Sequence, residues 1–255
     1  MIVMGGRGQM GAVMAQGRGG GNGLLTGLVA YWGLDEASGN AVDAHSNGLT
    51  LTAANAPGNA AGQVYATART FASASSQYFS RNSEAALQTG DIDFAFAAWV
   101  YLTTDAFCTV IAKDSTNTAN QRDFNIQYRS DTDRIRFIVV RNGGTQINLL
   151  ANSHGAITLN SWILVAAWHD AAADTINISI NNGTVDSAAT GGALQAASTW
   201  PLQIGARGNA PSAAIEYWQG RIGPIAFWKN RTLSAADRAA LWNGGNGLAY
   251  SGFTA

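Results

Sequence analysis

Charged residues and cysteine are both scarce in this chain of 255 residues. Only 12% of the residues are charged and the formal net charge is -1, so the chain has no strong electrostatic field to attract nucleic acid or an anionic membrane. We expect neither as a partner. The single cysteine, Cys108, excludes an intramolecular disulfide framework. Its position in the apolar stretch 107–111 favours a small buried side chain over a nucleophile.

Long apolar runs are also missing. No run reaches the roughly 18 apolar residues that a transmembrane helix needs. The first residues lack the charged start, the continuous apolar core and the small-residue cleavage site of a secretory signal. We therefore expect no transmembrane helix and no export by the general secretory route.

Residues suited to catalysis are few. A retaining glycosidase needs two carboxyl groups about 5 to 5.5 Å apart, but the only glutamates are Glu36, Glu84 and Glu216, and none has an acidic residue two or four positions away. Asp91 and Asp93 share a strand face but directly follow a glycine, where a solvated turn or a cation ligand is the alternative. The three histidines are scattered, with no zinc-site or triad spacing. We expect a protein that is not an enzyme.

The N-terminal residues 1–26 differ from the rest of the chain. The first 23 residues contain nine glycines, two arginines and no acidic residue, a composition that buries too little apolar surface to offset the entropy lost on ordering. We expect a separate arm here and one domain over residues 27–255. Methionine suits irregular pockets and arginine pairs with carboxylates, so the arm would be held by other assembly components or by further copies in a homo-oligomer. The candidate anchoring residues are Met1, Arg7, Met10, Met14 and Arg18.

The remainder shows repeated strand patterns. Polar and apolar residues alternate in 123–129 and in 134–138, which predicts a hairpin with one solvent-exposed face. Strict alternation in 175–180 is followed by Asn182-Gly183, a pair that favours a tight turn with positive φ at both positions. The nearly apolar stretch 162–168 predicts an inner strand covered on both faces.

Three segments, 28–36, 94–102 and 220–228, together with the end of the chain, carry a family resemblance. Ser234 is a candidate N-cap and Gly244 a stop signal, which predicts one short helix over 235–243. This arrangement resembles the laminin G-like, concanavalin A-like jelly-roll family. The resemblance implies an all-β fold, a two-sheet antiparallel jelly-roll sandwich with strands between 28 and 229 and one short C-terminal helix.

The same resemblance implies a calcium site at the rim of the sandwich. The family's early acidic loop matches a glycine-bearing stretch that contains Asp35, Asp43 and Asn47, and calcium prefers such oxygen ligands. Ala72 and Gly223-Pro224 stand where the family often has further acidic residues, which implies fewer ligands. The alternative is that these side chains fix the loop as Asx turns.

Carbohydrate binding requires an exposed aromatic ring beside polar groups. Five of the eight tryptophans lie in apolar strands and are expected in the core, namely Trp32, Trp99, Trp162, Trp168 and Trp228. The aromatic residues that remain are Trp200, Tyr217, Trp218 and Trp242, and of these Trp200, Tyr217 and Trp218 are the candidates for ligand contact.

Two functions remain open. The first is a structural or display protein of a large assembly, such as a bacteriophage virion, anchored by the arm and exposing a lectin-like domain to glycans or neighbouring proteins. The closing stretch 241–248 resembles phage and environmental bacterial members of the family. The second is an extracellular lectin-like module of a polysaccharide-processing system.

Overall fold

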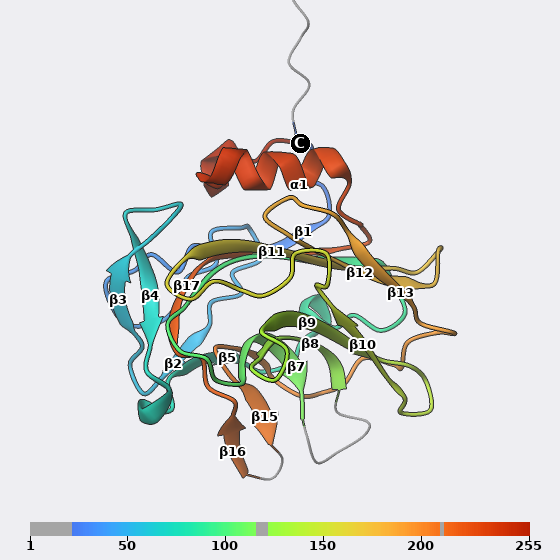
Figure 1. Cartoon of the computed structure of the whole chain (residues 1–255), viewed down its shortest axis with the longest axis horizontal. Coiled ribbons are helices and arrows are strands. Elements are labelled where there is room, and N and C mark those ends of the chain that lie inside the picture. The colour runs from blue at the N-terminus through green and yellow to red at the C-terminus, as the bar shows by residue number, and fades with distance from the viewer. Residues whose placement is uncertain (1–21, 116–121, 210–211) are drawn as a thin grey trace, which may run out of the picture.

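Two large antiparallel sheets pack face to face in the computed structural model, which describes residues 22–115, 122–209 and 212–255 (Figure 1). The eight-stranded sheet contains β1 (Leu28–Trp32), β3 (Gly58–Ala61), β4 (Thr67–Phe71), β6 (Phe94–Leu102), β11 (Trp162–Asp170), β12 (Thr175–Ile180), β13 (Asp186–Ala189) and β17 (Gly220–Lys229). The seven-stranded sheet contains β2 (Thr52–Ala54), β5 (Tyr78–Arg81), β7 (Cys108–Asp114), β8 (Arg122–Arg129), β9 (Arg134–Val140), β10 (Gln146–Leu150) and β14 (Leu202–Ile204).

The remaining elements are small. A two-stranded sheet pairs β15 (Arg207–Asn209) with β16 (Ser212–Ile215), and the α-helix is α1 (Ala235–Trp242). The short 3-10 helices are η1 (Ser73–Ser75), η2 (Ala85–Leu87), η3 (Asn243–Gly245) and η4 (Tyr250–Gly252).

Strand order shows that this is a jelly roll. The large sheets run β13-β12-β11-β6-β17-β4-β3, with β1 also paired to β17, and β10-β9-β8-β7-β14-β5-β2. Several neighbouring strands are distant in sequence, for example β1 and β17, β6 and β11, and β7 and β14. The expected all-β sandwich with one short C-terminal helix is confirmed.

The core lies between the two sheets and follows from the alternation of side chains along each strand. Phe124 and Ile126 of β8 point into it, as do Phe96 of β6 and Phe227 of β17. The Phe96 ring centroid lies 4.5 Å from that of Phe124 and 4.7 Å from that of Phe227. The Phe96–Phe124 contact joins the two sheets, whereas Phe96 and Phe227 are cross-strand partners in the eight-stranded sheet.

The outer face of the eight-stranded sheet is covered by α1 and the C-terminal segment (Figure 1). Trp99 of β6 stacks on Trp242 of α1 with ring centroids 5.3 Å apart, and Trp228 stacks on Phe253 at 6.1 Å. Strand β11 is consequently buried on both faces, as the apolar stretch 162–168 predicted. Ser234 and Asp237 form a capping box that fixes the start of α1.

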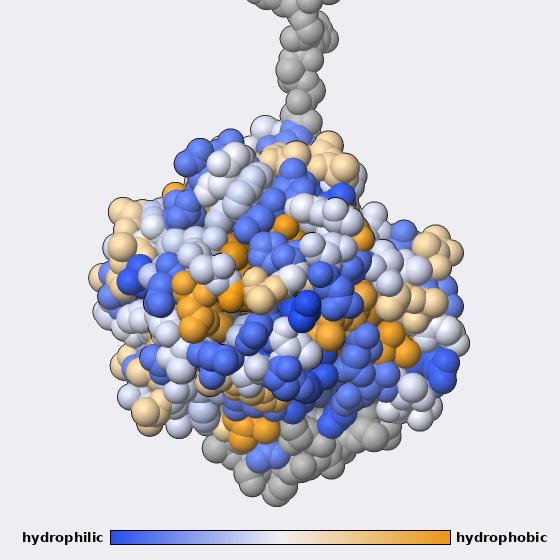
Figure 2. All heavy atoms as spheres, viewed as in Figure 1, coloured by the Kyte–Doolittle hydropathy of each residue, from blue (hydrophilic) through white to orange (hydrophobic). Residues whose placement is uncertain are grey.

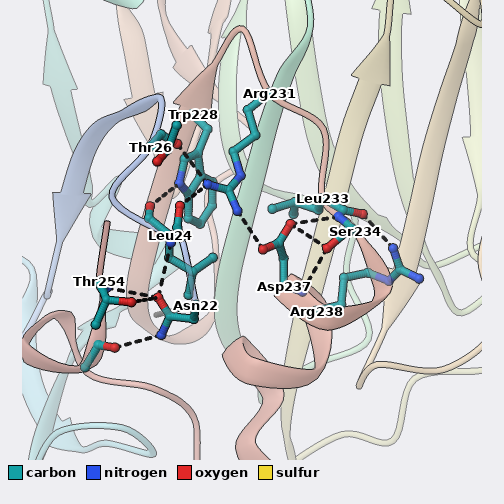
Figure 3. A network of polar contacts seen from close by, with 12 residues as sticks. Asn22, Leu24, Thr26, Trp228, Arg231, Leu233, Ser234, Asp237, Arg238 and Thr254 are labelled. Atoms are coloured by element: carbon teal, nitrogen blue, oxygen red, sulfur yellow. Dashed lines mark hydrogen bonds and ion pairs between the residues drawn. The ribbon is translucent and has the colours of Figure 1, made fainter. Parts of the chain in front are cut away.

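The two ends of the described fold are tied together next to α1 (Figure 3). Asn22 Nδ2 donates to the Gly252 carbonyl at 2.8 Å, and the Thr254 amide donates to Asn22 Oδ1 at 2.9 Å. Trp228 Nε1 donates to the Leu24 carbonyl at 2.8 Å, and Leu24 is fully buried. Residues 22–26 thus pack with the domain, before the boundary expected at residue 27. The anchoring residues Met1, Arg7, Met10, Met14 and Arg18 lie outside the described residues.

Two local expectations need correction. The β8–β9 hairpin forms as expected, but the polar side chains of β8 are buried rather than exposed to solvent. The turn after β12 is displaced by one residue, because positive φ occurs at Asn181 (53°) and Asn182 (56°), and the Gly183 amide donates to the Ile180 carbonyl.

The surface offers little apolar area. Among the described residues the only large hydrophobic side chain classed as exposed is that of Val42. Figure 2 shows hydrophilic residues mixed with small hydrophobic patches over the visible side. No helix in the described ranges is both long and apolar enough to cross a bilayer.

Candidate functional site

The outer side of the seven-stranded sheet carries a row of mostly polar residues that crosses every strand. Successive cross-strand partners in this row are Thr52, Ser80, Gln203, Ala112, Asn125, Ile138 and Asn148. Because Phe124 and Ile126 point into the core, Asn125 between them points outward. We call the outer side of this sheet the polar face.

A second row runs beside the first. Thr109 of β7 pairs with Gln127 of β8, Gln127 pairs with Arg136 of β9, and Arg136 pairs with Leu150 of β10. The alternation of β8 and β9 thus places amide, hydroxyl and guanidinium groups side by side on one surface.

The β15–β16 hairpin brings an ion-pair cluster to the polar face. It lies along β7, where Gly208 bridges to Ser115 and the Thr109 amide donates to the Glu216 carbonyl at 2.9 Å. Arg207 Nη1 lies 3.0 Å from Asp114 Oδ2 and Arg207 Nη2 lies 2.5 Å from Glu216 Oε1. One guanidinium therefore bridges two carboxylates that are far apart in sequence.

A buried ion pair positions Trp200 against this hairpin. Lys113 Nζ lies 2.8 Å from Asp123 Oδ2 and 3.1 Å from Ser198 Oγ, while the Ser198 amide donates to Asp123 Oδ1 at 2.7 Å. Both charged side chains are almost fully buried. They hold the segment before Trp200 in place, and the Trp200 indole lies against Gly208 of β15.

Several buried polar atoms in this region have no hydrogen-bond partner. An unpartnered buried polar atom costs about 1–3 kcal/mol, and native structures contain only a few. Here they include both donors and acceptors, a mixture that ordered water would satisfy. They are Asn125 Oδ1, Gln127 Nε2, Gln203 Oε1, Arg136 Nε, Arg207 Nε and Trp200 Nε1.

Hollows lie near both ends of the rows. The larger, of about 540 Å³, includes Thr52 and Ser80 from the end of the first row. Its full lining is Thr50, Thr52, Ser80, Arg81, Asn82, Ser83 and Glu84. Tyr78 lies two residues from Ser80 on the same face of β5, and its ring centroid is 6.1 Å from that of Tyr217. The smaller hollow, of about 250 Å³, includes Arg136 and Asn148.

Burial changes the proton affinity of two charged groups on the polar face. Burial raises the pKa of Glu216 above its ordinary value, although the ion pair with Arg207 opposes the change. Burial lowers the pKa of Arg136 to about 10, with added repulsion from Arg129 and Arg207. The polar face is thus a region where charge is held in partly desolvated surroundings.

The three aromatic candidates for ligand contact differ in position and burial. Trp200 and Tyr217 are partly buried and both lie at the hairpin side of the polar face. Trp218 is fully buried in the core, where its Nε1 donates to the Arg221 carbonyl at 3.2 Å. The expectation that Trp218 offers a ring to a ligand is therefore wrong, because its apolar surface is used in packing.

The loop expected to hold calcium is fixed by hydrogen bonds to the backbone of β1 and to backbone amides in and directly after the loop. Asp43 Oδ1 accepts from the Tyr31 amide at 3.0 Å and from the His45 amide at 2.9 Å, and Asp43 Oδ2 accepts from the Leu49 amide at 2.9 Å. Asn47 Nδ2 donates to the Val29 carbonyl at 2.7 Å, and Asp35 is exposed. Within the described residues no group of three or more histidine, cysteine, aspartate or glutamate side chains could hold a metal. These contacts agree with the Asx-turn alternative.

Other acidic candidates also have structural roles. Asp91 Oδ1 accepts from the Leu194 amide at 2.9 Å, and Asp93 Oδ1 accepts from the Ala171 amide at 2.8 Å. Cys108 is buried, as expected, and burial raises the pKa of its thiol. These side chains stabilise loops and core.

The sequence did not identify the Asp114, Arg207 and Glu216 cluster. The alternation of β8 indicated a polar surface, but no local spacing links Asp114 with Glu216. Their meeting depends on the pairing of β7 with the chain beyond β14.

The fold is similar to several solved structures of low sequence identity. The binding domain of Paraclostridial Mosquitocidal Protein 1 has a TM-score of 0.65 at 13% identity, with 87% of this chain and 53% of that chain covered. The botulinum neurotoxin serotype D binding domain has a TM-score of 0.59 at 13% identity, with 88% and 52% covered. The chain thus spans about half of these toxin binding domains.

A third similar structure is matched over almost its whole length. Domain 4 of AbnA, a GH43 extracellular arabinanase from Geobacillus stearothermophilus, in complex with arabinotriose, has a TM-score of 0.58 at 14% identity, with 83% of this chain and 96% of that chain covered. No curated protein matches this chain in sequence. The family model described as the concanavalin A-like lectin/glucanases superfamily matches residues 72–237, well over half of the chain. The chain belongs to this superfamily and has its lectin-like fold.

Proposed function

We propose that this protein is a carbohydrate-binding display protein and that its polar face is the glycan-binding surface. The larger hollow carries the proposal. It is lined by hydroxyl, amide and charged side chains, and the Tyr78–Tyr217 ring pair lies outside this lining, with Tyr78 two residues from Ser80 along β5. A sugar needs both kinds of group, since its hydroxyls require polar partners and its C–H face packs on an aromatic ring.

The two hollows could take separate parts of an extended ligand. They lie at the two ends of the first row, which crosses seven strands at about 4.8 Å per strand spacing, a span of roughly 29 Å, and the row is buried from Gln203 to Ile138 between its exposed ends. Domain 4 of the arabinanase is a solved relative in complex with arabinotriose, and the toxin relatives are binding domains. Both comparisons favour recognition over catalysis as the role of this fold.

The ion-pair cluster also supports a role in binding rather than hydrolysis. Asp114 and Glu216 lie near each other, but Arg207 is hydrogen-bonded to both. In a glycosidase the glycosidic oxygen or a water molecule would occupy the position between the two carboxyl groups. Here the guanidinium occupies it and keeps both carboxyl groups engaged.

The position of the chain ends supports display. Asn22 is bonded to Thr254, and the C-terminus lies beside α1, whereas β15–β16 projects from the opposite sheet (Figure 1). An arm that continues from Asn22 towards lower residue numbers would leave the domain on the side away from the polar face. The proposed assembly is a phage virion. Residues 1–21 would anchor the protein in it, and the polar face would be directed outward.

A second function is an extracellular module of a polysaccharide-processing system. The near-complete match to an arabinanase domain favours it. Mass spectrometry of purified particles and of the cell-free medium separates the two, because a virion protein is recovered with particles at constant stoichiometry.

Glycan binding is tested by isothermal titration with arabino-oligosaccharides and with other neutral and acidic oligosaccharides. Loss of one stacking ring should weaken binding about two- to tenfold, so Tyr78→Ala and Tyr217→Ala should each reduce affinity by this amount. Tyr101→Ala is the control, because Tyr101 contacts Trp162 on the other sheet. Binding by no member of the panel, or equal losses in all three variants, would contradict the proposal.

A further inference from the structure

The smaller hollow is distinguished by its arginines. Its polar lining includes Arg129, Thr132, Arg136, Asn148 and Asn152. The guanidinium carbons of Arg129 and Arg136 lie 5.1 Å and 6.0 Å from the centroid of the Phe107 ring. Two cations therefore share one aromatic ring, which lines a different hollow together with Arg129.

The two arginines differ in how their charge is balanced. Arg129 forms a two-contact ion pair with Asp131. Arg136 donates to the neutral Gln127 Oε1, and its buried Nε has no partner. Within the described residues Arg136 forms no ion pair with a carboxylate, although its side chain is partly buried.

The neighbours of Arg136 act on its charge in both directions. Burial and the repulsion from Arg129 and Arg207 lower its pKa to about 10, against a smaller opposite effect of Glu216 and Asp131. A negative group in the hollow would offset this repulsion. The neutral groups of Thr132, Asn148 and Asn152 lie in the same hollow and could bind hydroxyls around that negative group.

We infer that the smaller hollow binds the acidic group of an anionic saccharide, a carboxylate or a sulfate, through Arg136. The inference rests on the proposed function, since it names the class of glycan that the polar face prefers. The planar guanidinium fork suits both acids, because it donates two parallel hydrogen bonds to paired oxygens. A neutral glycan would leave Arg136 without a counter-charge.

The test compares three ligands by isothermal titration at low ionic strength: oligogalacturonate as the carboxylated probe, a heparin oligosaccharide as the sulfated probe and arabinotriose as the neutral probe. We expect at least one acidic probe to bind more tightly than the neutral one and to lose affinity as salt is added. Arg136→Gln should weaken that probe about tenfold or more and weaken the neutral probe far less. Arg136→Lys should give an intermediate loss, because it keeps the charge without the fork.

The matched control is Arg221→Gln, which removes the same charge from an arginine that lies over the Tyr101 ring of the other sheet. It should leave the affinity for every probe unchanged. Equal affinity of wild type and Arg136→Gln for the acidic probes would overturn the inference and leave the proposed function intact if the neutral probe binds. Equal weakening of neutral and acidic probes would also overturn it, because Arg136 would then act on the whole face. Binding of none of the three probes would reject the inference.

Discussion

The indole of Trp200 lies directly against the backbone of Gly208. A β-carbon at Gly208 would come within 2.0 Å of Trp200 Nε1 and 2.3 Å of Trp200 Cε2. Only glycine lets the two segments approach this closely, so the seating of Trp200 beside β15 depends on the missing side chain. The Lys113–Asp123 ion pair fixes the segment before Trp200 through Ser198, which limits how far the indole can withdraw.

Replacing Gly208 with alanine should therefore destabilise the protein. We expect Gly208→Ala to lower the free energy of unfolding by about 1–3 kcal/mol, the usual cost of overpacking, as measured by urea denaturation. Gly223→Ala is the control, because a β-carbon there would meet its nearest neighbour at an ordinary 3.4 Å. In a Trp200→Ala background the cost of Gly208→Ala should largely disappear. A cost that persists in that background would mean that the Trp200–Gly208 contact is not its cause.

The sequence predicted the strands and their buried faces well because these depend on local patterns. Alternation along 123–129 and the apolar run 162–168 determine which strand faces are buried, and Ser234 marks the start of α1. The jelly-roll topology came from resemblance rather than from these patterns. Position within the sandwich was harder to predict: Trp218 has polar sequence neighbours yet is fully buried.

The candidate site was harder to predict from the sequence than the strands were. Arg207, Asp114 and Glu216 meet only because the chain beyond β14 continues along β7. The sequence alternation placed the polar residues of β8 on one face of the sheet. It could not predict their burial, because burial depends on the segments that cover this face. Long-range pairing therefore determines the chemistry of the polar face.

The buried carboxyl group of Glu216 should make stability depend on pH. Its pKa in the folded protein is raised above the ordinary value of 4.5, so the folded state binds this proton more tightly than the unfolded chain does. The free energy of unfolding should then fall as the pH rises from about 4.5 through the raised pKa. Glu216→Gln removes this titration, so its stability should change less than that of wild type across this range.

The measurement is urea denaturation of both proteins at several values between about pH 4.5 and pH 7.5. Glu84→Gln is the control, because it removes a carboxyl group that is 41% exposed and paired with Arg81. Parallel stability curves for wild type and Glu216→Gln would show that Glu216 keeps an ordinary proton affinity.

Asp43 should stabilise its loop without a metal ion. Asp43→Ala removes the acceptor of the Tyr31, His45 and Leu49 amides, so the free energy of unfolding should fall by about 3 kcal/mol or more. Asp43→Asn should cost less, since its single amide oxygen can still accept from some of these donors. The melting temperature of wild type should be the same in excess calcium and in chelator. Stabilisation by calcium that disappears in Asp43→Ala would instead establish the calcium site implied by the family resemblance.

Two truncations should separate the arm from the domain. Removal of residues 1–21 keeps Asn22 and its bonds to Gly252 and Thr254, so the melting temperature should change little. Removal of residues 1–26 also deletes the fully buried Leu24 and the acceptor of Trp228 Nε1. It should lower the free energy of unfolding by on the order of 3 kcal/mol, as measured by urea denaturation.

The same pair of truncations tests the display proposal. If residues 1–21 hold the protein in its assembly, their removal should abolish incorporation into particles while the melting temperature and glycan affinity stay unchanged, because the polar face lies on the sheet opposite α1. Incorporation is measured by immunoblotting of purified particles. Normal incorporation of the shorter protein would contradict the anchoring role. Unfolding on removal of residues 1–21 would instead make them a structural part of the domain, because the clamp at Asn22 would then be insufficient to close the fold.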